Sequence, residues 1–215
     1  MFSDTFLHAT FQSKSRLTTG STLSHCALIA APTYSERIVL SAVALNIAPD
    51  IEQKRDICQN AIGFVRAMSI AEPKIAVLSV VEMVITKMAS TLDAAVLAKM
   101  ADRGQITGAS VDEPLDPDAA VDAEAAQINN IDSPVADRAN LLIAPNIEAG
   151  NMVYKELAFM AYAQTASLVV GARVPLILTS LADREEARRF SAAVAVLYAA
   201  ALKRDFATIC PNIEE

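Results

Sequence analysis

The sequence predicts an α/β protein in which helices cover both faces of a mostly parallel sheet. Two observations carry this prediction. Short apolar segments alternate with longer segments of helical periodicity along most of the 215 residues, a pattern typical of parallel strands joined by helical crossovers. Residues Lys74–Val84 form a β-branched run that suits a parallel strand buried on both faces.

Composition restricts the class of protein and its partners. Hydrophobic residues make up 53% and charged residues 20%, and the longest apolar run, Ala192–Leu202, is too short to span a bilayer. We therefore expect no membrane association and assign the surplus apolar surface to the core or to a protein interface, which predicts an oligomer. The net charge is −7 and tryptophan is absent, so we expect no nucleic-acid partner.

The cysteines and histidines do not predict a metal site. Cys26, Cys58 and Cys210 have no CxxC spacing, and His8 and His25 are the only histidines. An odd number of cysteines favours a reduced compartment. The first residues lack a basic segment followed by an apolar one, so we expect a cytoplasmic protein without a signal peptide.

Residues 1–20 are polar and read as a short helix or loop that leads into the first strand. His25–Ala31 and Arg37–Val43 are apolar segments around a turn, which predicts a hairpin. His25 is interpreted as a strand-edge or core histidine, because no second ligand stands at metal spacing.

The first long helix begins at Asp50, with Gln53 completing a capping box, and its apolar stripe runs from Ile57 to Met68. The next helix starts near Ser90 and ends at Gly104. The elements expected after it are a strand at Gly108–Val111, a turn at Asp112–Asp118, a helix at Ala119–Ile128, a strand at Ala139–Ala144 and an amphipathic helix after Gly150.

The stretch Ile131–Asn151 contains a turn, a short strand and a loop with one glycine that enters this amphipathic helix. Backbone N–H groups at such a junction, together with the helix dipole, favour an anion. The alternative is that the junction is only scaffold of the α/β fold.

The segments Leu168–Ala172 and Pro175–Thr179 are two predicted strands with only two residues between them. A parallel crossover needs a dozen or more residues, so they are either one bent strand or strands of two sheets. We place a domain boundary here, which divides the chain into residues 1–173 and 174–215. The last helix, Arg184–Arg204, is apolar nearly all round over part of its length and is expected to be buried on more than one side.

Asp183 follows Ser180 at the second strand–helix turn and allows two interpretations. With Glu186 three residues later it forms a capping box on sequence alone. Alternatively, its carboxylate acts as a general base beside the Ser180 hydroxyl.

Several motifs, in order and spacing, resemble the phosphate acetyltransferase/phosphate butyryltransferase family. The segments that carry the resemblance are Asn46–Asp50, Pro73–Ser79, Lys87–Ala95, Met100–Gly108, Ser133–Ala136, Pro145–Asn151, Gly171–Pro175 and Thr179–Ser180. The resemblance covers the chain from about His8 to the C-terminal helix.

The resemblance implies a three-layer α/β/α fold of the isocitrate/isopropylmalate dehydrogenase-like kind and a homodimer formed through residues 1–173. It implies transfer of an acetyl or butyryl group between coenzyme A and inorganic phosphate, with no metal and no permanently bound cofactor. Ser180 would bind phosphate or acyl phosphate, and Asp183 would accept the thiol proton. The residues expected on loops facing the cleft are Lys87, Ser133, Pro134, Gly150 and Asn151.

The sequence departs from the family pattern at the expected site. Leu181 stands where family members carry an arginine, whose bidentate grip on phosphate leucine lacks. Family members also tend to have aspartate at Ala30, Ala42 and Asn146, glycine at Glu113 and Asp137, and asparagine at Ile85. The chain starts well into the family pattern, so we expect an N-terminally truncated member, with 174–215 a remnant of the first domain.

Two functions remain open from the sequence. The first is a phosphate acyltransferase, whose cleft another polypeptide would complete. The second is a truncated, catalytically impaired paralogue that acts as an interaction or binding module. A decarboxylating dehydrogenase is a distant third, because the sequence shows no metal-binding carboxylate set.

Overall fold

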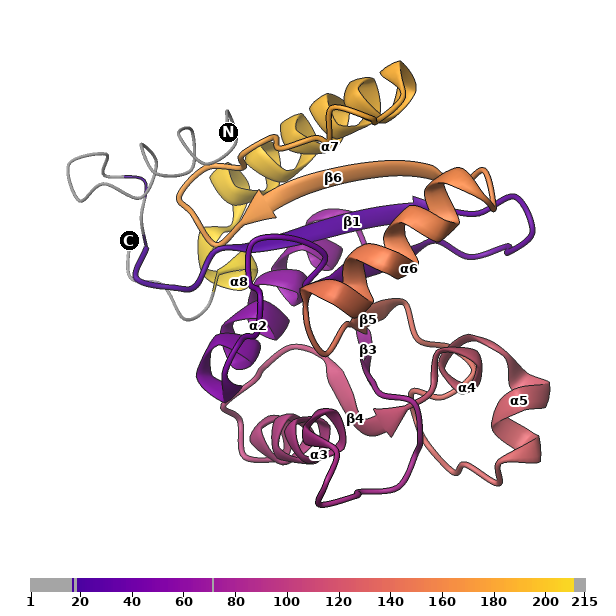
Figure 1. Cartoon of the computed structure of the whole chain (residues 1–215). Helices are drawn as coiled ribbons and strands as arrows, with labels where there is room; N and C mark the ends of the chain where they lie inside the picture. The colour runs from indigo at the N-terminus through magenta and orange to yellow at the C-terminus, as the bar shows by residue number, and fades with distance from the viewer. Residues whose placement is uncertain (1–16, 18, 71, 211–215) are drawn as a thin grey trace.

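The computed structural model describes residues 17, 19–70 and 72–210, and its centre is a six-stranded sheet of order β4-β3-β5-β2-β1-β6 (Figure 1). The strands are β1 (Ser24–Ala30), β2 (Ile38–Ser41), β3 (Lys74–Leu78), β4 (Ser110–Leu115), β5 (Leu141–Ile143) and β6 (Gln164–Val170). The four strands from β4 to β2 pair in parallel, and β1 is antiparallel to both of its neighbours. The predicted mostly parallel sheet and the predicted β1–β2 hairpin are confirmed.

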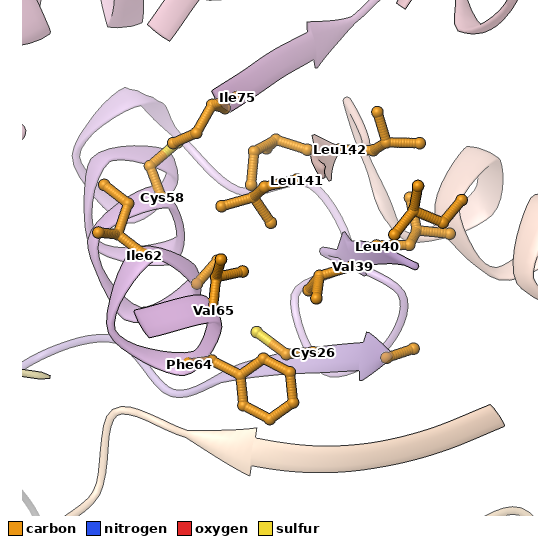
Figure 2. Close-up of a cluster of buried hydrophobic side chains, with 14 of the residues drawn as sticks. Cys26, Val39, Leu40, Cys58, Ile62, Phe64, Val65, Ile75, Leu141 and Leu142 are labelled. Carbon is orange, nitrogen blue, oxygen red and sulfur yellow. The ribbon is translucent and has the colours of Figure 1, made fainter. Parts of the chain in front are cut away.

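Helices lie on both faces of this sheet, as predicted. They are α2 (Ile51–Ala67), α3 (Ala89–Asp102), α4 (Pro117–Val121), α5 (Ala123–Ile128), α6 (Ile147–Phe159), α7 (Glu185–Arg204) and α8 (Phe206–Ile209). Successive residues of a strand point to opposite faces, and β1 shows the two layers. Cys26 points into the core toward α2 (Figure 2), whereas His25 lies beside Tyr154 of α6.

Helix α2 supplies one wall of the main core. Its predicted apolar stripe is buried from Ile57 to Val65, and Cys58, Ile62 and Val65 of this stripe are seen in Figure 2. The ring centroids of Phe64 and of Tyr198 of α7 lie 5.9 Å apart. Burying one such side chain stabilises the fold by about 1.5–3 kcal/mol. The helix begins with the predicted capping box, in which Gln53 N donates to Asp50 at 2.9 Å and Asp50 N donates to Gln53 at 3.0 Å.

Strand β3 is shorter than predicted. It ends at Leu78, and the following residues form an exposed loop in which Val80 is 67% and Met83 72% accessible. The last ladder-like bond in this region runs from Ser79 N to Leu115 O at 2.9 Å. The prediction of a strand to Val84 was wrong because an apolar run does not reveal where its neighbouring strands end.

The segment between β3 and β5 also differs from the prediction. Strand β4 extends to Leu115, where a turn was expected, and it accommodates Pro114 because an edge strand leaves one side of its backbone unpaired. The helix predicted at Ala119–Ile128 is two short helices. Asp122 divides them because its side chain accepts the N–H of Ala125 at 2.9 Å and caps α5.

The chain reverses direction after β6. Val169 and Leu176 exchange backbone hydrogen bonds of 2.8 and 3.1 Å in a single antiparallel bridge, and the predicted strand Pro175–Thr179 does not form. This reversal is neither of the two arrangements expected from the sequence. Helix α7 then packs on β6, and the Ser191 hydroxyl accepts the N–H of Ser167 at 2.9 Å, which covers the edge of the sheet.

Some sequence predictions concern other parts of the chain or stay untested. Residues 1–16, including His8, lie outside the described residues, as does residue 18. The division into residues 1–173 and 174–215 stays a prediction. Within the described ranges, no helix combines the length and apolar character needed to cross a membrane.

Candidate functional site

A pocket opens at the carboxyl end of β2, where parallel sheets commonly bind ligands. Its volume is about 370 Å³. Five separate parts of the chain form it: the start of β1, the loop after β2, the middle of α6, strand β6 and the turn before α7. The residues that line it are His25, Val43, Ala44, Leu45, Asn151, Tyr154, Lys155, Ser167, Leu178, Thr179, Ser180 and Asp183.

The turn from Ser180 to Asp183 is closed by two hydrogen bonds. The Asp183 carboxylate accepts the backbone N–H of Ser180 at 2.7 Å, and the backbone N–H of Asp183 donates to the Ser180 carbonyl at 3.1 Å. The N-cap of α7 is Arg184, which makes no side-chain capping bond. The capping interpretation of Asp183 was therefore wrong, and its carboxylate instead lies at the pocket.

The hydroxyl of Ser180 faces the same pocket. Its oxygen accepts the N–H of Ala182 at 3.3 Å. A hydroxyl also has one O–H donor, so Ser180 can still donate to an oxygen atom of a ligand. Leu181, between these residues, is 96% accessible and takes no part in lining the pocket.

Lys155 brings a positive charge to the pocket from α6. Its Nζ lies 3.8 Å from Asp183 Oδ1 and about 5.5 Å from the ring centres of Tyr154 and Phe159. The side chain as a whole is 34% accessible, but Nζ itself is buried and has no hydrogen-bond partner in the described part of the chain. The sequence analysis did not select this lysine.

His25 also lines the pocket, although the sequence indicated only a strand-edge or core histidine. Burial lowers its pKa to about 4, and a backbone hydrogen bond with Leu178 opposes this shift only in part. The imidazole is therefore neutral at pH 7. Its Nδ1 is buried without a hydrogen-bond partner among the described residues, so its capacity for one hydrogen bond is unused.

Asn151 and Gly150 are adjacent residues of α6 with different roles. Asn151 lines the pocket and donates to the carbonyl of Val43 at 3.2 Å, which joins α6 to the loop after β2. Gly150 lies within the helix, not in the loop before it as predicted. A Cβ at Gly150 would stand 2.7 Å from the carbonyl oxygen of Ala42, so glycine permits this close approach.

Several N–H groups at the N-terminus of α6, which the sequence suggested as donors to an anion, already have partners within the protein. Asn146 is the N-cap, and its side chain accepts the N–H of Ala149 at 2.9 Å. The N–H of Ile147 donates to the carbonyl of Ile47 at 3.3 Å. These groups already have partners, which favours the scaffold interpretation of Ile131–Asn151.

The other predicted cleft residues do not line this pocket. Lys87 is exposed in the loop between β3 and α3, which leaves the same edge of the sheet as the loop after β2. Ser133 bonds to Asp112 and accepts the N–H groups of Val135 and Ala136 at 3.0 and 2.9 Å, while Pro134 follows it in that turn. The structure thus brings together Ser180, Asp183 and Asn151 and leaves these three apart.

In the part of the chain that the structure describes, no group of three or more histidine, cysteine, aspartate or glutamate side chains could hold a metal ion. Cys26, Cys58 and Cys210 are all buried free thiols.

Comparison with known proteins adds a family context to this geometry. The family described as "Phosphate acetyl/butaryl transferase" matches residues 3–196. The chain is 47% identical to a phosphate acetyltransferase of Rhizobium meliloti over 200 residues, which is 93% of this chain and 63% of the relative. It is 40% identical to a phosphate butyryltransferase of Clostridium acetobutylicum, with 91% and 65% coverage.

A solved structure is similar as well. The branched-chain phosphotransacylase from Enterococcus faecalis V583 superposes with a TM-score of 0.84 at 31% identity, over 91% of this chain and 70% of the other. The chain spans somewhat less than two thirds of the length of the two curated relatives above.

Proposed function

Because this chain belongs to the phosphate acetyl/butyryl transferase family, we propose that it transfers an acyl group between coenzyme A and inorganic phosphate. The observation that carries the proposal is the turn in which the Asp183 carboxylate is fixed beside Ser180, with Lys155 opposite it in one pocket. This arrangement supplies a proton acceptor, a hydroxyl donor and a cation. Relatives named for acetyl transfer and for butyryl transfer are both at least 40% identical to this chain, so both acyl groups belong to the proposal.

Ser180 and Asp183 have separate roles in the proposed reaction. The Ser180 hydroxyl donates to an oxygen of the phosphate or acyl phosphate. Asp183 accepts the thiol proton of coenzyme A while sulfur attacks the acyl carbon. The bond between that carbon and the phosphate oxygen breaks with its electron pair on phosphate, and the proton then passes to phosphate.

The remaining predicted residues contribute to binding in this proposal. Asn151 holds the loop after β2 against α6, and Gly150 allows that close approach. Lys87, Ser133 and Pro134 are proposed contacts for the more distant parts of coenzyme A, because the coenzyme is longer than the pocket is wide. Coenzyme A and acyl-CoA act as substrates, and we propose no permanently bound cofactor.

We also propose that the protein is a cytoplasmic homodimer. Its three buried free thiols suit a reducing compartment. The dimer is expected to form through residues 1–173, where Met152 of α6 and Met160 directly after this helix are 69% and 74% exposed, which is apolar surface that a second copy can bury. Sedimentation that yields only monomer over a wide concentration range would refute the dimer.

The enzymatic proposal is tested by incubating the protein with phosphate and either acetyl-CoA or butyryl-CoA and following thiol release. Ser180→Ala is expected to lower the rate on the order of 10²-fold, as for loss of one preorganised donor. Ser69→Ala serves as the matched control because Ser69 is exposed and outside this pocket. Absence of thiol release at high protein concentration, with both acyl groups, would refute acyl transfer by this chain.

A further inference from the structure

We infer that Lys155 is the cation that binds the phosphate group in this pocket. Leu181 is uncharged, so it does not supply the positive charge of the arginine that family members carry at its position. The inference rests on the proposed function for its substrate and on the side-chain geometry for its location. It assigns an anion-binding role to a residue of α6, far in sequence from the Thr179–Ser180 turn.

The first step is the unusual placement of the ammonium group. Lysine side chains ordinarily bury their methylene groups and keep the charged end in water. Lys155 does the opposite, because the side chain is 34% accessible while Nζ is buried. An ammonium group has three N–H donors, and a buried donor without a partner is destabilising. A ligand with several acceptor oxygens would satisfy these donors.

The neighbours of Lys155 within the protein do not use the N–H donors of its ammonium group. Asp183 Oδ1 stands at 3.8 Å, which permits charge attraction but is too long for a hydrogen bond. The rings of Tyr154 and Phe159 interact with the charge and accept no conventional hydrogen bond. The ammonium group is thus buried beside the pocket with its hydrogen-bonding capacity unused, and rotation of the partly exposed side chain would bring Nζ to a ligand in the pocket.

The third step concerns the other basic groups near the turn. Leu181 is 96% accessible and offers no charge. Arg188 donates to the backbone carbonyl of Leu181 at 3.0 Å, and Arg184 stacks over the ring of Tyr162 at 5.3 Å. Neither arginine lines the pocket that contains Ser180, whereas Lys155 does.

The pair of Lys155 and Asp183 also couples proton transfer to phosphate binding. While Asp183 is ionised, it attracts Lys155 and repels an anion. When the thiol proton moves to Asp183 and the sulfur–carbon bond forms, that carboxyl becomes neutral and Lys155 is available to the departing phosphate. The phosphate leaves with the electron pair of the carbon–oxygen bond and then takes the proton from Asp183.

The test measures binding of inorganic phosphate without coenzyme A, by ³¹P NMR titration. Lys155→Met is expected to weaken phosphate binding roughly tenfold or more, the factor for losing a charge-assisted hydrogen bond, and Lys155→Arg to retain most of it. Lys99→Met is the matched control, because Lys99 forms an exposed pair with Asp102 and lies outside the pocket. Unchanged binding by Lys155→Met, or no phosphate binding by the unmodified protein, would overturn the inference.

A second variant keeps the test decisive if Lys155→Met does not fold. Asp183→Asn removes the negative charge that competes for Lys155 and preserves the side-chain shape, so phosphate binding should tighten several-fold. A purely structural Lys155–Asp183 pair predicts no such gain. In the double variant with Lys155→Met the gain should vanish. Unchanged or weaker binding by Asp183→Asn would refute the inference.

The binding and transfer assays separate this inference from the proposed function. Phosphate binding that depends on Lys155, without any acyl transfer, would support the inference and refute the enzymatic proposal. Acyl transfer with an unchanged KM for phosphate in Lys155→Met would do the reverse. If both hold, Lys155→Met should raise the KM for phosphate and leave the KM for acyl-CoA within a factor of about two.

Discussion

The carboxylate of Asp183 accepts the backbone N–H of Ser180 at 2.7 Å, so these two residues form one rigid unit at the pocket. The carboxylate is 5% accessible and faces the lysine of a neighbouring helix. The backbone of Ser180 and the carboxylate of Asp183 are thus held together before any ligand binds, with Lys155 Nζ 3.8 Å from that carboxylate. Preorganisation of this kind favours catalysis, because little rearrangement is needed during the reaction.

Leu181 lies at the exposed corner of this turn, and substitutions there test the effect of restoring a positive charge. Leu181→Arg places the family's guanidinium beside Ser180, and we expect thiol release to rise on the order of 10²-fold. Leu181→Lys should give a smaller gain, because an ammonium group lacks the bidentate fork. Stability should change by about 0.5 kcal/mol or less in both, since the side chain is 96% accessible. Equal rates for all three proteins would contradict the prediction.

Gly150 offers a test of how closely α6 approaches the loop after β2. Helix propensity alone predicts that Gly150→Ala stabilises α6 by about 1 kcal/mol. The added Cβ would stand 2.7 Å from the carbonyl oxygen of Ala42, so we expect destabilisation of about 1–3 kcal/mol instead. Urea unfolding measures the difference. Glu156→Ala, on the exposed side of the same helix, is the control and should be nearly neutral.

The N-cap of α6 can be changed to the residue typical of the family. Asn146→Asp keeps a side-chain acceptor for the N–H of Ala149 and adds a negative charge at the positive end of the helix dipole. We expect stabilisation of about 0.3–1 kcal/mol, decreasing with added salt. Asn146→Ala removes the acceptor and should destabilise by about 1 kcal/mol. Thermal unfolding at low and high salt measures both changes. Destabilisation by Asn146→Asp, or stabilisation by Asn146→Ala, would contradict the prediction.

His25 gives the stability a defined pH dependence. Burial lowers its folded-state pKa to about 4, below the value of 6.5 for an unperturbed histidine. The unfolded chain therefore binds more protons between these values, and stability is full above about pH 6.5 and decreases as the pH falls toward 4. From this shift we expect the protein to be about 1 kcal/mol less stable at pH 5.5 than at pH 7.5.

The variant His25→Gln checks the source of that pH dependence. It removes the titrating group, so urea unfolding should show a much smaller difference between the two pH values. The pH range lies above the ordinary pKa of most carboxylates, which limits their contribution. An undiminished difference in His25→Gln would assign the effect to other groups.

The sequence was sufficient where local chemistry decides the structure. Asp50 and Gln53 cap α2 as predicted, and the hairpin of β1 and β2 follows from two apolar segments around a turn. It was insufficient at the end of β3, because the exposure of Val80 depends on where the paired strands end. Burial at such a position is a property of the assembled sheet, not of the residue pattern.

The candidate site was predicted only in part, because some of its residues are brought together by packing and not by their order in the sequence. Ser180 and Asp183 are close in sequence, so a motif could identify them. Lys155 and His25 each appear alone in the sequence, and only the packing of α6 against the turn and the start of β1 brings them to one pocket. The capping box at Asp183 failed because the carboxylate bonds to Ser180 N, within the turn that precedes the helix.

The antiparallel bridge between Val169 and Leu176 has a consequence for how the site is positioned. It fixes Leu176 to β6 only four residues before Ser180. The position of Ser180 relative to the sheet therefore depends on how β6 pairs with β1. A slip of that pairing by one residue would turn the β6 side chains to the opposite face and carry Ser180 away from Lys155. The register of the edge strand β6 thus determines where Ser180 lies relative to Lys155 in the pocket.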